Sequence, residues 1–396
     1  MIDADRIRKD ADELHPAAVE IRRHLHRNPE LSFREEKTEA FVAERLAGIG
    51  TPFKRGVGGH GLVATITGGR PGGRIALRAD MDALPIRELN ETEYVSCNEG
   101  VMHACGHDAH TSCLLVATEI LHRNRDEIPG TVDLLFQPAE EHAPGGATAM
   151  IADGALADDV AHVFGQHVNT ELPVGTVGFN GGLFMASADE IYITVEGRGG
   201  HAAKPHQEVD PIVIASHLVV ALQQIVSRNA DPTVPSVLSF GRITGDGAAN
   251  VIPDHVRLEG TFRTVNEEWR NDALERVERV SQSLVSALGG VARVEVVRGY
   301  PPLVNDEQTT AFARQRAVGY LGESAVVDLD PAMWAEDFAY FALSRPSCFY
   351  NLGIRNESRG IVHSVHTARF DIDEDALRIG AGLLAWIAVG ALEQRL

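Results

Sequence analysis

The stretch HACGHDAH at residues 103–110 restricts the fold more than any other feature of this chain. It places three imidazoles and one thiol within eight residues, and thiolate and imidazole are ligands that zinc and similar metals prefer. The following run has apolar residues at helical spacing, which predicts a helix that begins at the cluster. A helix N-terminus also favours a thiolate. Cys105 and His107 alone do not complete a metal site, so the fold must bring further ligands here.

Length and composition predict two domains and exclude some partners. Single cores seldom grow past about 250–300 residues, and this chain has 396. Its formal net charge of −20 argues against nucleic acid and anionic membranes, because phosphate contacts need clustered Lys and Arg. The cysteines form no CxxC pair, the start MIDADRIRKD has no apolar export segment, and the apolar run at 380–392 is too short to span a bilayer. We therefore expect a cytoplasmic protein that does not enter the membrane.

The first part of the chain has the pattern of an α/β domain. Helices are predicted at 4–27 and from about residue 35, and strands at 61–67, 74–78 and 131–136. When strands alternate with helices, sites collect at the carboxyl ends of the strands. Asp80, Asp82, Glu140 and Glu141 follow such strands, so we expect them to lie close to the Cys/His cluster.

Residues 184–301 are predicted to form an inserted domain. Their elements follow the order βαββαβ of a ferredoxin-like α+β domain. The strands are expected at 188–198, 236–244, 255–264 and 292–298, and the helices at 211–228 and 267–288. Glycines at 178–182 and Pro301-Pro302 are the predicted hinges. The first domain would then comprise residues 1–183 and 302–396, with further helices at 307–321 and near the C-terminus.

The carboxylates at the strand ends are candidates for metal binding and proton transfer. One member of Glu140-Glu141 could bind a metal while its neighbour acts as general base for a water molecule. Adjacent glutamates are more often a solvated pair, but these follow an apolar strand and Gln-Pro. Asp82 is expected to orient a ligand histidine through its other ring nitrogen, and loop capping is the simpler alternative for Asp80 and Asp82.

Two more histidines extend the candidate metal site. His167 ends the strand-like run HVFGQHV and His366 lies in VHTARF. A lone histidine beside apolar residues is more often a hydrogen-bonded core residue. Together with Cys105, His107 and Glu141, however, the two make five ligands, which suits a two-metal site with a shared ligand. The thiolate of Cys105 could bridge the two ions.

The inserted domain carries candidate substrate contacts. His201 in GRGGHAAKPH follows a glycine turn and could donate a hydrogen bond to a polarised carbonyl, or could stabilise the turn itself. Asn250 in GAANVIP and Arg263 in GTFRT could bind a substrate carboxylate, the arginine through a bidentate fork. A structural role is the alternative for both residues.

These motifs together resemble the M20 metallopeptidase family, and specifically its aminoacylase/amidohydrolase branch with the hippurate hydrolases and indole-acetyl-amino-acid hydrolases. They run in order along nearly the whole chain: RRHLHRNPELSF, RADMDALPI, HACGHDAH, QPAEE, GGHAAKPH, ANVIP, AEDF and VHTARF. The resemblance implies a zinc-peptidase α/β domain, with a mixed sheet and helices on both faces, and an inserted lid that commonly forms a dimer contact. A homodimer or dimer-based oligomer is therefore expected.

The resemblance also implies a role for each candidate residue. It assigns two divalent metal ions to Cys105, His107, Glu141, His167 and His366. Zinc is the expected metal, and manganese, cobalt and nickel are alternatives for the same ligands. Glu140 would be the general base, and His201 and Asn250 the substrate contacts. His363 stands three residues before His366, and the following TARFDIDED is what favours His366 as the ligand.

The implied reaction is hydrolysis of the amide bond of a small N-acyl amino acid, which releases a carboxylic acid and a free amino acid. Glu140 would deprotonate the attacking water and return the proton to the leaving amine. A dipeptidase or an N-acetyl-diaminopimelate deacetylase would use the same residues and is the alternative. A non-catalytic metal-binding protein is disfavoured, because Glu140 stands beside a full ligand set. The sequence leaves the acyl preference and the physiological metal open.

Overall fold

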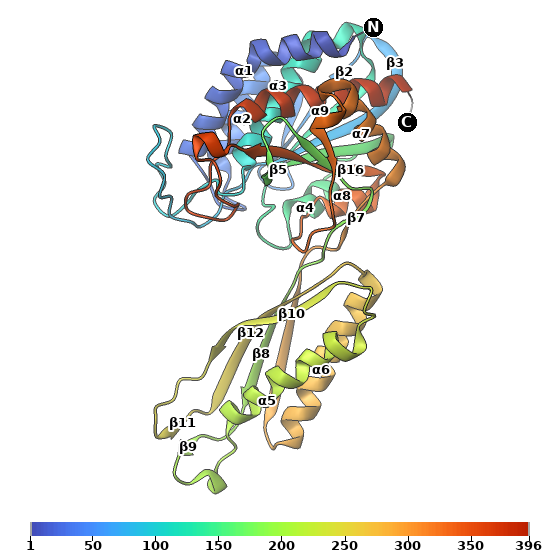
Figure 1. Ribbon diagram of the computed structural model, residues 1–396. Coiled ribbons are helices and arrows are strands. Elements are labelled where there is room, and N and C mark those ends of the chain that lie inside the picture. The colour runs from blue at the N-terminus through green and yellow to red at the C-terminus, as the bar shows by residue number, and fades with distance from the viewer. Residues whose placement is uncertain (1, 395–396) are drawn as a thin grey trace. The chain divides into compact units, whose positions relative to one another are not determined.

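The computed structural model describes residues 2–394, which divide into two compact units (Figure 1). Unit 1 contains the residues up to Phe184, Val304–Asp330 and those from Asp337 onward. Unit 2 contains Met185–Leu303 and Pro331–Glu336. The strands β7 (Gly182–Met185) and β14 (Leu303–Asn305) pair with each other where the chain passes between the units. The short stretch 331–336 lies outside the predicted insertion of residues 184–301.

Unit 1 is built on a mixed eight-stranded sheet with the order β1-β2-β4-β3-β5-β16-β6-β15. Its strands are β1 (Phe53–Val57), β2 (Gly61–Thr67), β3 (Arg70–Asp80), β4 (Pro129–Gln137), β5 (Val160–Pro173), β6 (Val177–Phe179), β15 (Val326–Asp328) and β16 (Ser347–Arg355). The central strands β4, β3, β5 and β16 run parallel to one another, while β1, β2 and β4 pair antiparallel. The parallel strands therefore present their carboxyl ends at one edge, which is where the candidate residues were expected.

The helices of unit 1 lie on both faces of this sheet, as predicted. They are α1 (Ala4–Arg27), α2 (Glu36–Ile49), α3 (His107–Arg123), α4 (Gly146–Ala152), α7 (Glu307–Leu321), α8 (Ala339–Ser344) and α9 (Asp375–Gln394). Helices α1, α3 and α9 pack against one another, with α3 and α9 also against the sheet, whereas α4 and α8 pack against each other and against β4 and β16 (Figure 1). The predicted helix after the Cys/His cluster is thus a central element of the core.

The apolar C-terminal helix α9 is a core helix, as its sequence predicted. Leu383, Leu384 and Ile387 on α9 have no exposed surface. The prediction that the run at 380–392 is too short to span a bilayer was wrong, because it belongs to α9, which is 20 residues long. By length and composition alone, α9 and residues 211–229 could both cross a bilayer. Most of α9 is enclosed within unit 1. In the second stretch, Leu218 and Leu222 are fully buried in the core of unit 2.

Unit 2 has the predicted ferredoxin-like arrangement. Its elements in chain order are β8 (Asp189–Glu196), α5 (Pro211–Gln224), β10 (Ser236–Thr244), β12 (His255–Thr264), α6 (Glu267–Ala287) and β13 (Val291–Arg298). The strand order in space is β10-β12-β8-β13, all antiparallel, which is the order that a βαββαβ unit of this type requires. A π-helical turn, Ile225–Asn229, extends α5, and a small hairpin-like sheet joins β9 (Gly200–His201) to β11 (Val251–Ile252).

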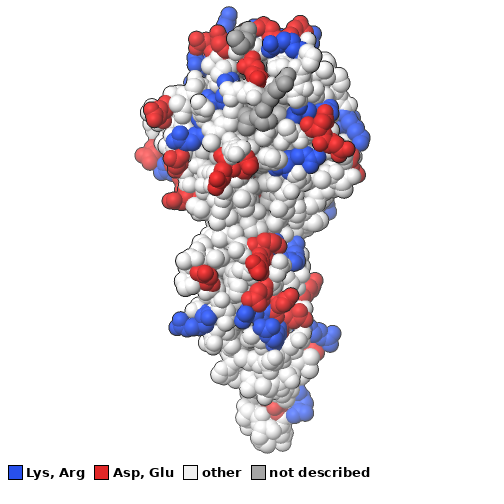
Figure 2. Space-filling model, turned by 90° about the vertical axis from the view of Figure 1, so that its right-hand side faces the viewer, with Lys and Arg blue, Asp and Glu red and all other residues white. Residues whose placement is uncertain are grey.

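The surface carries charges of both signs. Figure 2 shows Lys and Arg side chains interspersed with Asp and Glu on the face that it presents, together with large uncharged areas. Phosphate-binding proteins instead gather basic side chains into a continuous patch. On this face acidic and basic side chains are thus mixed.

Candidate active site

The segment after β4 is held by a buried carboxylate from the segment after β3. The register pairs Asp80 of β3 with Gln137 of β4, so the residues that follow the two strands lie side by side. Asp82 accepts a hydrogen bond from the backbone N–H of Glu140 at 3.0 Å through Oδ1, and from that of Glu141 at 2.9 Å through Oδ2. Asp82 thereby determines the direction in which both glutamates leave the turn.

Asp82 also orients His107, as the sequence predicted for a ligand histidine. The Nδ1 atom of His107 lies 3.2 Å from Asp82 Oδ1 and donates to it. The opposite ring atom, Nε2, lies 3.9 Å from the nearest carboxylate oxygens of both Glu140 and Glu141. Burial by itself lowers the pKa of His107, but Asp80, Asp82 and Glu141 outweigh it and raise the pKa to about 10. The carboxylates therefore favour a positive charge at this point.

The remaining predicted ligands complete one continuous cluster. Cys105 Sγ lies 3.3 Å from His167 Nε2, and His366 Nε2 lies 3.2 Å from Glu141 Oε1. His366 adopts a φ of 60°, and its backbone N–H donates to Ala104 O at 2.7 Å, which ties its loop to the HACGH segment. Of the two histidines that the sequence left as alternatives, His366 is the one beside Glu141.

The donor atoms fit divalent metal ions. Three sets of potential ligand atoms each converge within 4.8 Å, and neighbouring sets share a residue: Cys105, His107 and His167; Cys105, Glu141 and His366; His107, Glu140 and Glu141. Among the described residues, the buried atom His107 Nε2 has no hydrogen-bond partner, and the buried Glu141 Oε1 has the His366 ring nitrogen at 3.2 Å. Leaving a buried polar atom unpaired is costly, and a cation coordinated by His107 Nε2 would remove that cost.

The surroundings of the Cys105 thiol also favour a bound cation. Burial raises the pKa of its thiol well above the ordinary value, and the neighbouring carboxylates Glu141, Glu140 and Asp80 raise it further. A coordinated metal ion reverses this effect, since a coordinating thiol is deprotonated. The thiol is therefore neutral without a cation beside it, and a bound metal ion would favour its thiolate form.

Glu140 is anchored from the opposite side by the AEDF segment. Its Oε1 lies 3.4 Å from the backbone N–H of Asp337. The Asp337 carboxylate accepts hydrogen bonds from Arg78 at 2.9 Å, from Gln137 at 2.7 and 2.8 Å, and from the backbone N–H of Ala147 at 3.0 Å. Burial raises the pKa of Asp337 to about 6. This residue was not among the predicted site residues, although AEDF stood among the motifs.

The segment Leu31–Glu35 was also missed as part of the site. Ser32 Oγ donates to Asp82 Oδ2 at 2.6 Å, and Glu35 Oε1 accepts from the backbone N–H of Ala139 at 2.8 Å. Glu35 is completely buried although it precedes an exposed helix start. From the sequence, the second helix was expected to start near Glu35, and that residue was given no part in the site.

In unit 2 the structure brings together two of the three predicted substrate contacts. His201 pairs with Val251 across the small sheet, and the backbone N–H of Ala202 donates to Asn250 O at 3.1 Å, so His201 and Asn250 lie side by side and exposed. Arg263 lies elsewhere, because it is at the far end of β12, roughly 25 Å along the strand from its first residue. His201 and Asn250 of one chain therefore do not share a single small carboxylate with Arg263 of that chain.

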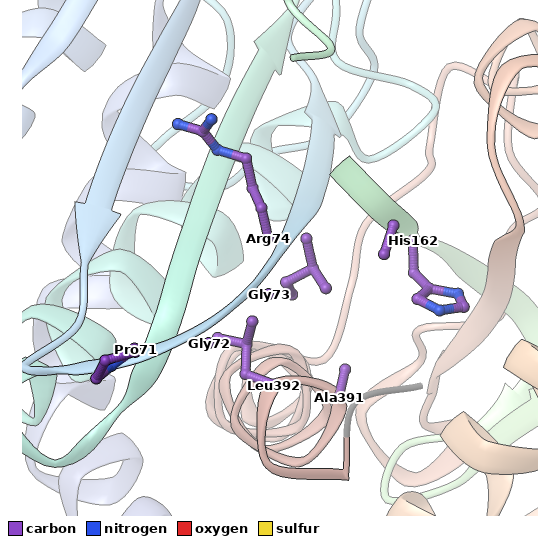
Figure 3. A pocket seen from close by; sticks show the side chains of 9 residues that line it. Pro71, Gly72, Gly73, Arg74, His162, Ala391 and Leu392 are labelled. Atoms are coloured by element: carbon purple, nitrogen blue, oxygen red, sulfur yellow. The ribbon is translucent and has the colours of Figure 1, made fainter. Parts of the chain in front are cut away.

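A separate cavity of about 410 Å³ lies at the other ends of the same strands (Figure 3). Arg74 at the start of β3, His162 near the start of β5 and Leu392 near the end of α9 are among its lining residues. Arg74 is paired with Asp133 at 3.0 Å, and His162 Nδ1 with Thr309 Oγ1 at 3.0 Å. The side chains of Arg74 and His162 are thus both engaged in structural contacts.

A thiol, imidazoles and carboxylates that converge at the carboxyl ends of parallel strands, with a glutamate beside them, define a metal-dependent hydrolase. Comparison with known proteins identifies which one. The chain belongs to peptidase family M20/M25/M40, whose family model matches residues 76–389. This assignment agrees with the family that the sequence motifs resembled.

Individual relatives cover nearly the whole chain. An N-acetyl-L-cysteine deacetylase of Bacillus subtilis (strain 168) is 44% identical over 91% of this chain and 84% of its own length. The IAA-amino acid hydrolase ILR1-like 4 of Arabidopsis thaliana is 38% identical over 93% of this chain and 84% of its own. The crystal structure of the Bacillus subtilis YXEP protein, described as a dinuclear metal binding peptidase from the M20 family, superposes with a TM-score of 0.82 at 33% identity, covering 96% of this chain and 99% of that one. The protein is therefore a metal-dependent amidohydrolase.

Proposed function

We propose that this amidohydrolase acts on N-acyl amino acids and releases a carboxylic acid and a free amino acid. The observation that carries the proposal is the placement of Glu140, whose carboxylate stands beside converging ligand atoms on a turn that Asp82 holds through two backbone hydrogen bonds. Two relatives, 44% and 38% identical over the aligned residues, are named for an N-acetyl amino acid and for an amino acid conjugate. Both names describe an acyl group joined to an amino acid.

We infer that five residues hold two divalent metal ions: Cys105, His107, Glu141, His167 and His366. Zinc suits this mixture of sulfur, nitrogen and oxygen donors, and manganese, cobalt and nickel are the alternatives. Bound at such ligands, divalent ions act as Lewis acids on a carbonyl oxygen and lower the pKa of water. Asp82 supports the set by holding His107 with Nε2 toward the other ligands.

Glu140 is the proposed general base and acid. It takes a proton from the attacking water as the new C–O bond forms at the amide carbon. It then gives that proton to the leaving nitrogen as the C–N bond breaks, so that the carboxylic acid and the free amine depart and Glu140 is again ionised. Glu140 is held at two points, because Asp82 accepts from its backbone N–H and the Asp337 N–H contacts its side chain. Such preorganisation is what a proton shuttle between two substrate atoms requires.

Unit 2 supplies the proposed substrate contacts. His201 would donate a hydrogen bond to the carbonyl oxygen, with Asn250 beside it as a second polar contact. Arg263 would bind the free carboxylate of the amino acid, and because it lies far along β12 from His201 and Asn250, those two contacts would come from a second copy of the chain. One of its donors is engaged with Met333 O at 3.2 Å, and a guanidinium carries further N–H groups in a fixed fork. We further propose that unit 2 acts as a lid and as the contact of a homodimer, and that the protein works in the cytoplasm.

The test is an assay of chelator-stripped protein restored in turn with zinc, manganese, cobalt or nickel. The substrates are acetyl, benzoyl, lauroyl and indole-acetyl amino acids, with dipeptides and N-acetyl-diaminopimelate as separate arms. We expect hydrolysis of at least one N-acyl amino acid to return with metal, and the Glu140→Gln protein to bind the same metal without turnover. Hydrolysis of dipeptides alone, or silence on every substrate with metal bound, would overturn the proposed substrate class.

A further inference from the structure

We propose that Asp80 and His110 form a positioning pair that holds the backbone of Val168, whose carbonyl fixes the tautomer of His167 and so presents its Nε2 atom to the metal. This inference deepens the proposed function, because it rests on His167 being a metal ligand. The residues come from three elements that the fold brings together: Asp80 ends β3, His110 lies in the first turn of α3, and His167 and Val168 lie on β5. Neither Asp80 nor His110 belongs to the proposed ligand set.

The backbone of Val168 determines where the protons lie. A backbone N–H can only donate, and that of Val168 points at His110 Nε2 at 2.9 Å, so this nitrogen carries no proton. A neutral His110 therefore carries its proton on Nδ1, which donates to Asp80 Oδ1 at 2.6 Å. The carbonyl of Val168 can only accept, and it lies 2.7 Å from His167 Nδ1. His167 consequently has its proton on Nδ1 and its lone pair on Nε2.

That lone pair is directed at the metal site, because His167 Nε2 lies 3.3 Å from Cys105 Sγ. Val168 is thus held at its N–H by His110 and at its carbonyl by His167. The opposite tautomer of His110 would set an N–H against the Val168 N–H and push this strand residue away. His110 therefore acts on His167 through the peptide backbone rather than by direct contact.

Arg78 makes a carboxylate necessary at position 80. A guanidinium is a donor only, and Arg78 Nη1 donates to Asp80 Oδ2 at 2.6 Å while His110 donates to Oδ1. Asp80 must accept on both oxygens, which an amide of the same size cannot do. Arg78, Asp80 and His110 are each at most 1% exposed, so bulk water does not replace a lost partner. In the series of hydrogen bonds Arg78–Asp80–His110–Val168, the donor and acceptor roles are therefore fixed by the guanidinium of Arg78 at one end and the backbone N–H of Val168 at the other.

The same contacts argue against Asp80 and His110 as metal ligands of their own. Ligand atoms of Asp80, His107 and His110 do lie within 4.8 Å of one another. Both ring nitrogens of His110, however, are engaged, one with Asp80 and one with the backbone of Val168. A metal at His110 would have to displace one of these hydrogen bonds, whereas His107 Nε2 has no partner to displace among the described residues.

The direct test reads the tautomers without any metal. Protein labelled with ¹⁵N in its histidines is stripped of metal, and long-range ¹H–¹⁵N correlations distinguish Nδ1–H from Nε2–H rings. The His110 signals are assigned by their disappearance in His110→Gln. We expect His110 and His167 of the wild-type protein to be Nδ1–H tautomers. An Nε2–H ring at His110 would overturn the proposal, whatever the variants do.

The second test compares substitutions that separate the two hydrogen bonds of His110. In His110→Gln the amide oxygen can replace Nε2 as acceptor for Val168, while in His110→Asn the amide can replace only Nδ1 as donor to Asp80. We expect His110→Asn and Asp80→Asn to weaken cobalt and zinc binding by about 10- to 100-fold, the usual cost of losing a group that orients a ligand, and His110→Gln to lose less. Affinity is measured by competition with a chromophoric chelator, and the cobalt absorption spectrum reports the change at the site.

The matched control is His162→Asn. His162 is a buried histidine five residues before His167 on the same strand, and its Nδ1 partner is Thr309. It is expected to bind metal as the wild-type protein does. Equal affinity in Asp80→Asn, His110→Asn and the control would overturn the proposal. Circular dichroism shows whether Asp80→Asn folds. If it does not, the comparison of His110→Asn with His110→Gln and the tautomers of the wild-type protein still test the proposal. Metal binding and tautomers are read separately from turnover, so a silent substrate panel would refute the proposed substrate class without touching this inference.

Discussion

Glu35 Oε1 accepts a hydrogen bond from the backbone N–H of Ala139 at 2.8 Å. Asp82 accepts the next two amides, those of Glu140 and Glu141, so two buried carboxylates hold three successive N–H groups of the turn that carries the proposed base. Ala139 adopts a φ of 54° there, a conformation that side chains other than glycine rarely take. The turn is thus held in an unfavourable backbone conformation by hydrogen bonds from outside it, which is common at functional sites.

Removing the Glu35 acceptor is expected to displace Glu140 while leaving metal binding intact. Glu35→Ala should lower kcat roughly 100-fold, because a displacement of about 1 Å can cost that much in a positioned catalytic group. Glu35→Gln keeps an oxygen for the Ala139 N–H and should lose much less. Steady-state kinetics and metal content of both proteins check this, and a metal-depleted Glu35→Ala protein would show that the residue supports the ligands instead.

Glu35 also predicts a pH dependence of stability. Burial, and next the charge of Asp82, raise its pKa from 4.5 to about 7. A raised pKa means that the folded protein holds the proton more tightly than the unfolded chain, so this contribution to stability is complete below pH 4.5 and is lost as the pH rises through 7. In metal-free protein, Glu35→Gln should therefore gain stability relative to wild type as the pH rises from 4.5 to 7. Urea unfolding at several pH values measures this, and a constant difference would contradict it.

Glu140→Gln separates chemistry from binding. The amide cannot accept a proton from water, so turnover should fall by about 10²- to 10⁴-fold, the usual contribution of a general base. The five proposed ligands are unchanged, so metal content should stay at the wild-type level. Glu140→Asp serves as the comparison that keeps a carboxylate with a shorter reach. A Glu140→Gln protein with a near-normal rate would show that another group moves the proton.

Asp82→Asn is expected to damage the metal site itself. The new NH₂ group must face either the His107 Nδ1–H or one of the two backbone N–H groups that Asp82 now accepts. Loss of a carboxylate that orients a ligand histidine typically lowers metal affinity about 10- to 100-fold. Ser32→Ala removes only the hydroxyl that donates to Asp82 and should have a much smaller effect. Chelator competition on the two variants gives the comparison, and similar affinities would argue against this role of Asp82.

Gly106 is expected to be required for the close approach of α3 to β5. A Cβ there would lie 2.5 Å from Val168 Cγ2, and Gly106 has a φ of 87°. Gly106→Ala should therefore destabilise the fold by about 1–3 kcal/mol through overpacking. The matched control is Gly48→Ala in α2, where a Cβ meets nothing within 4 Å, and there alanine should stabilise the helix by about 0.5–1 kcal/mol. Urea unfolding of both proteins measures the two signs.

The local pattern of the sequence was sufficient for most of the architecture. The local sequence pattern predicted α1, α7, β2, β10 and β12 with their observed bounds. These elements bury one face against a single core, so their residues must follow the period of the element itself. The order βαββαβ likewise led to the ferredoxin-like sheet, because few topologies satisfy the rules for connecting such elements. Short elements such as β1 and α4 were missed, since a few residues carry no clear period.

The types of residue in the sequence identified the candidate ligands. Only the tertiary structure identified the residues that hold the surrounding segments in place by hydrogen bonds. Thiol, imidazole and carboxylate at strand ends are recognisable in the sequence, because metals select few side-chain types. Asp80, Glu35 and Asp337 look like loop or helix-start residues in the sequence, where capping is the ordinary role of an acidic side chain. Only the fold shows that each is buried and accepts a hydrogen bond from a distant segment. Hydrogen bonds of this kind depend on distances between strands and turns remote in the chain, and no local pattern encodes those distances.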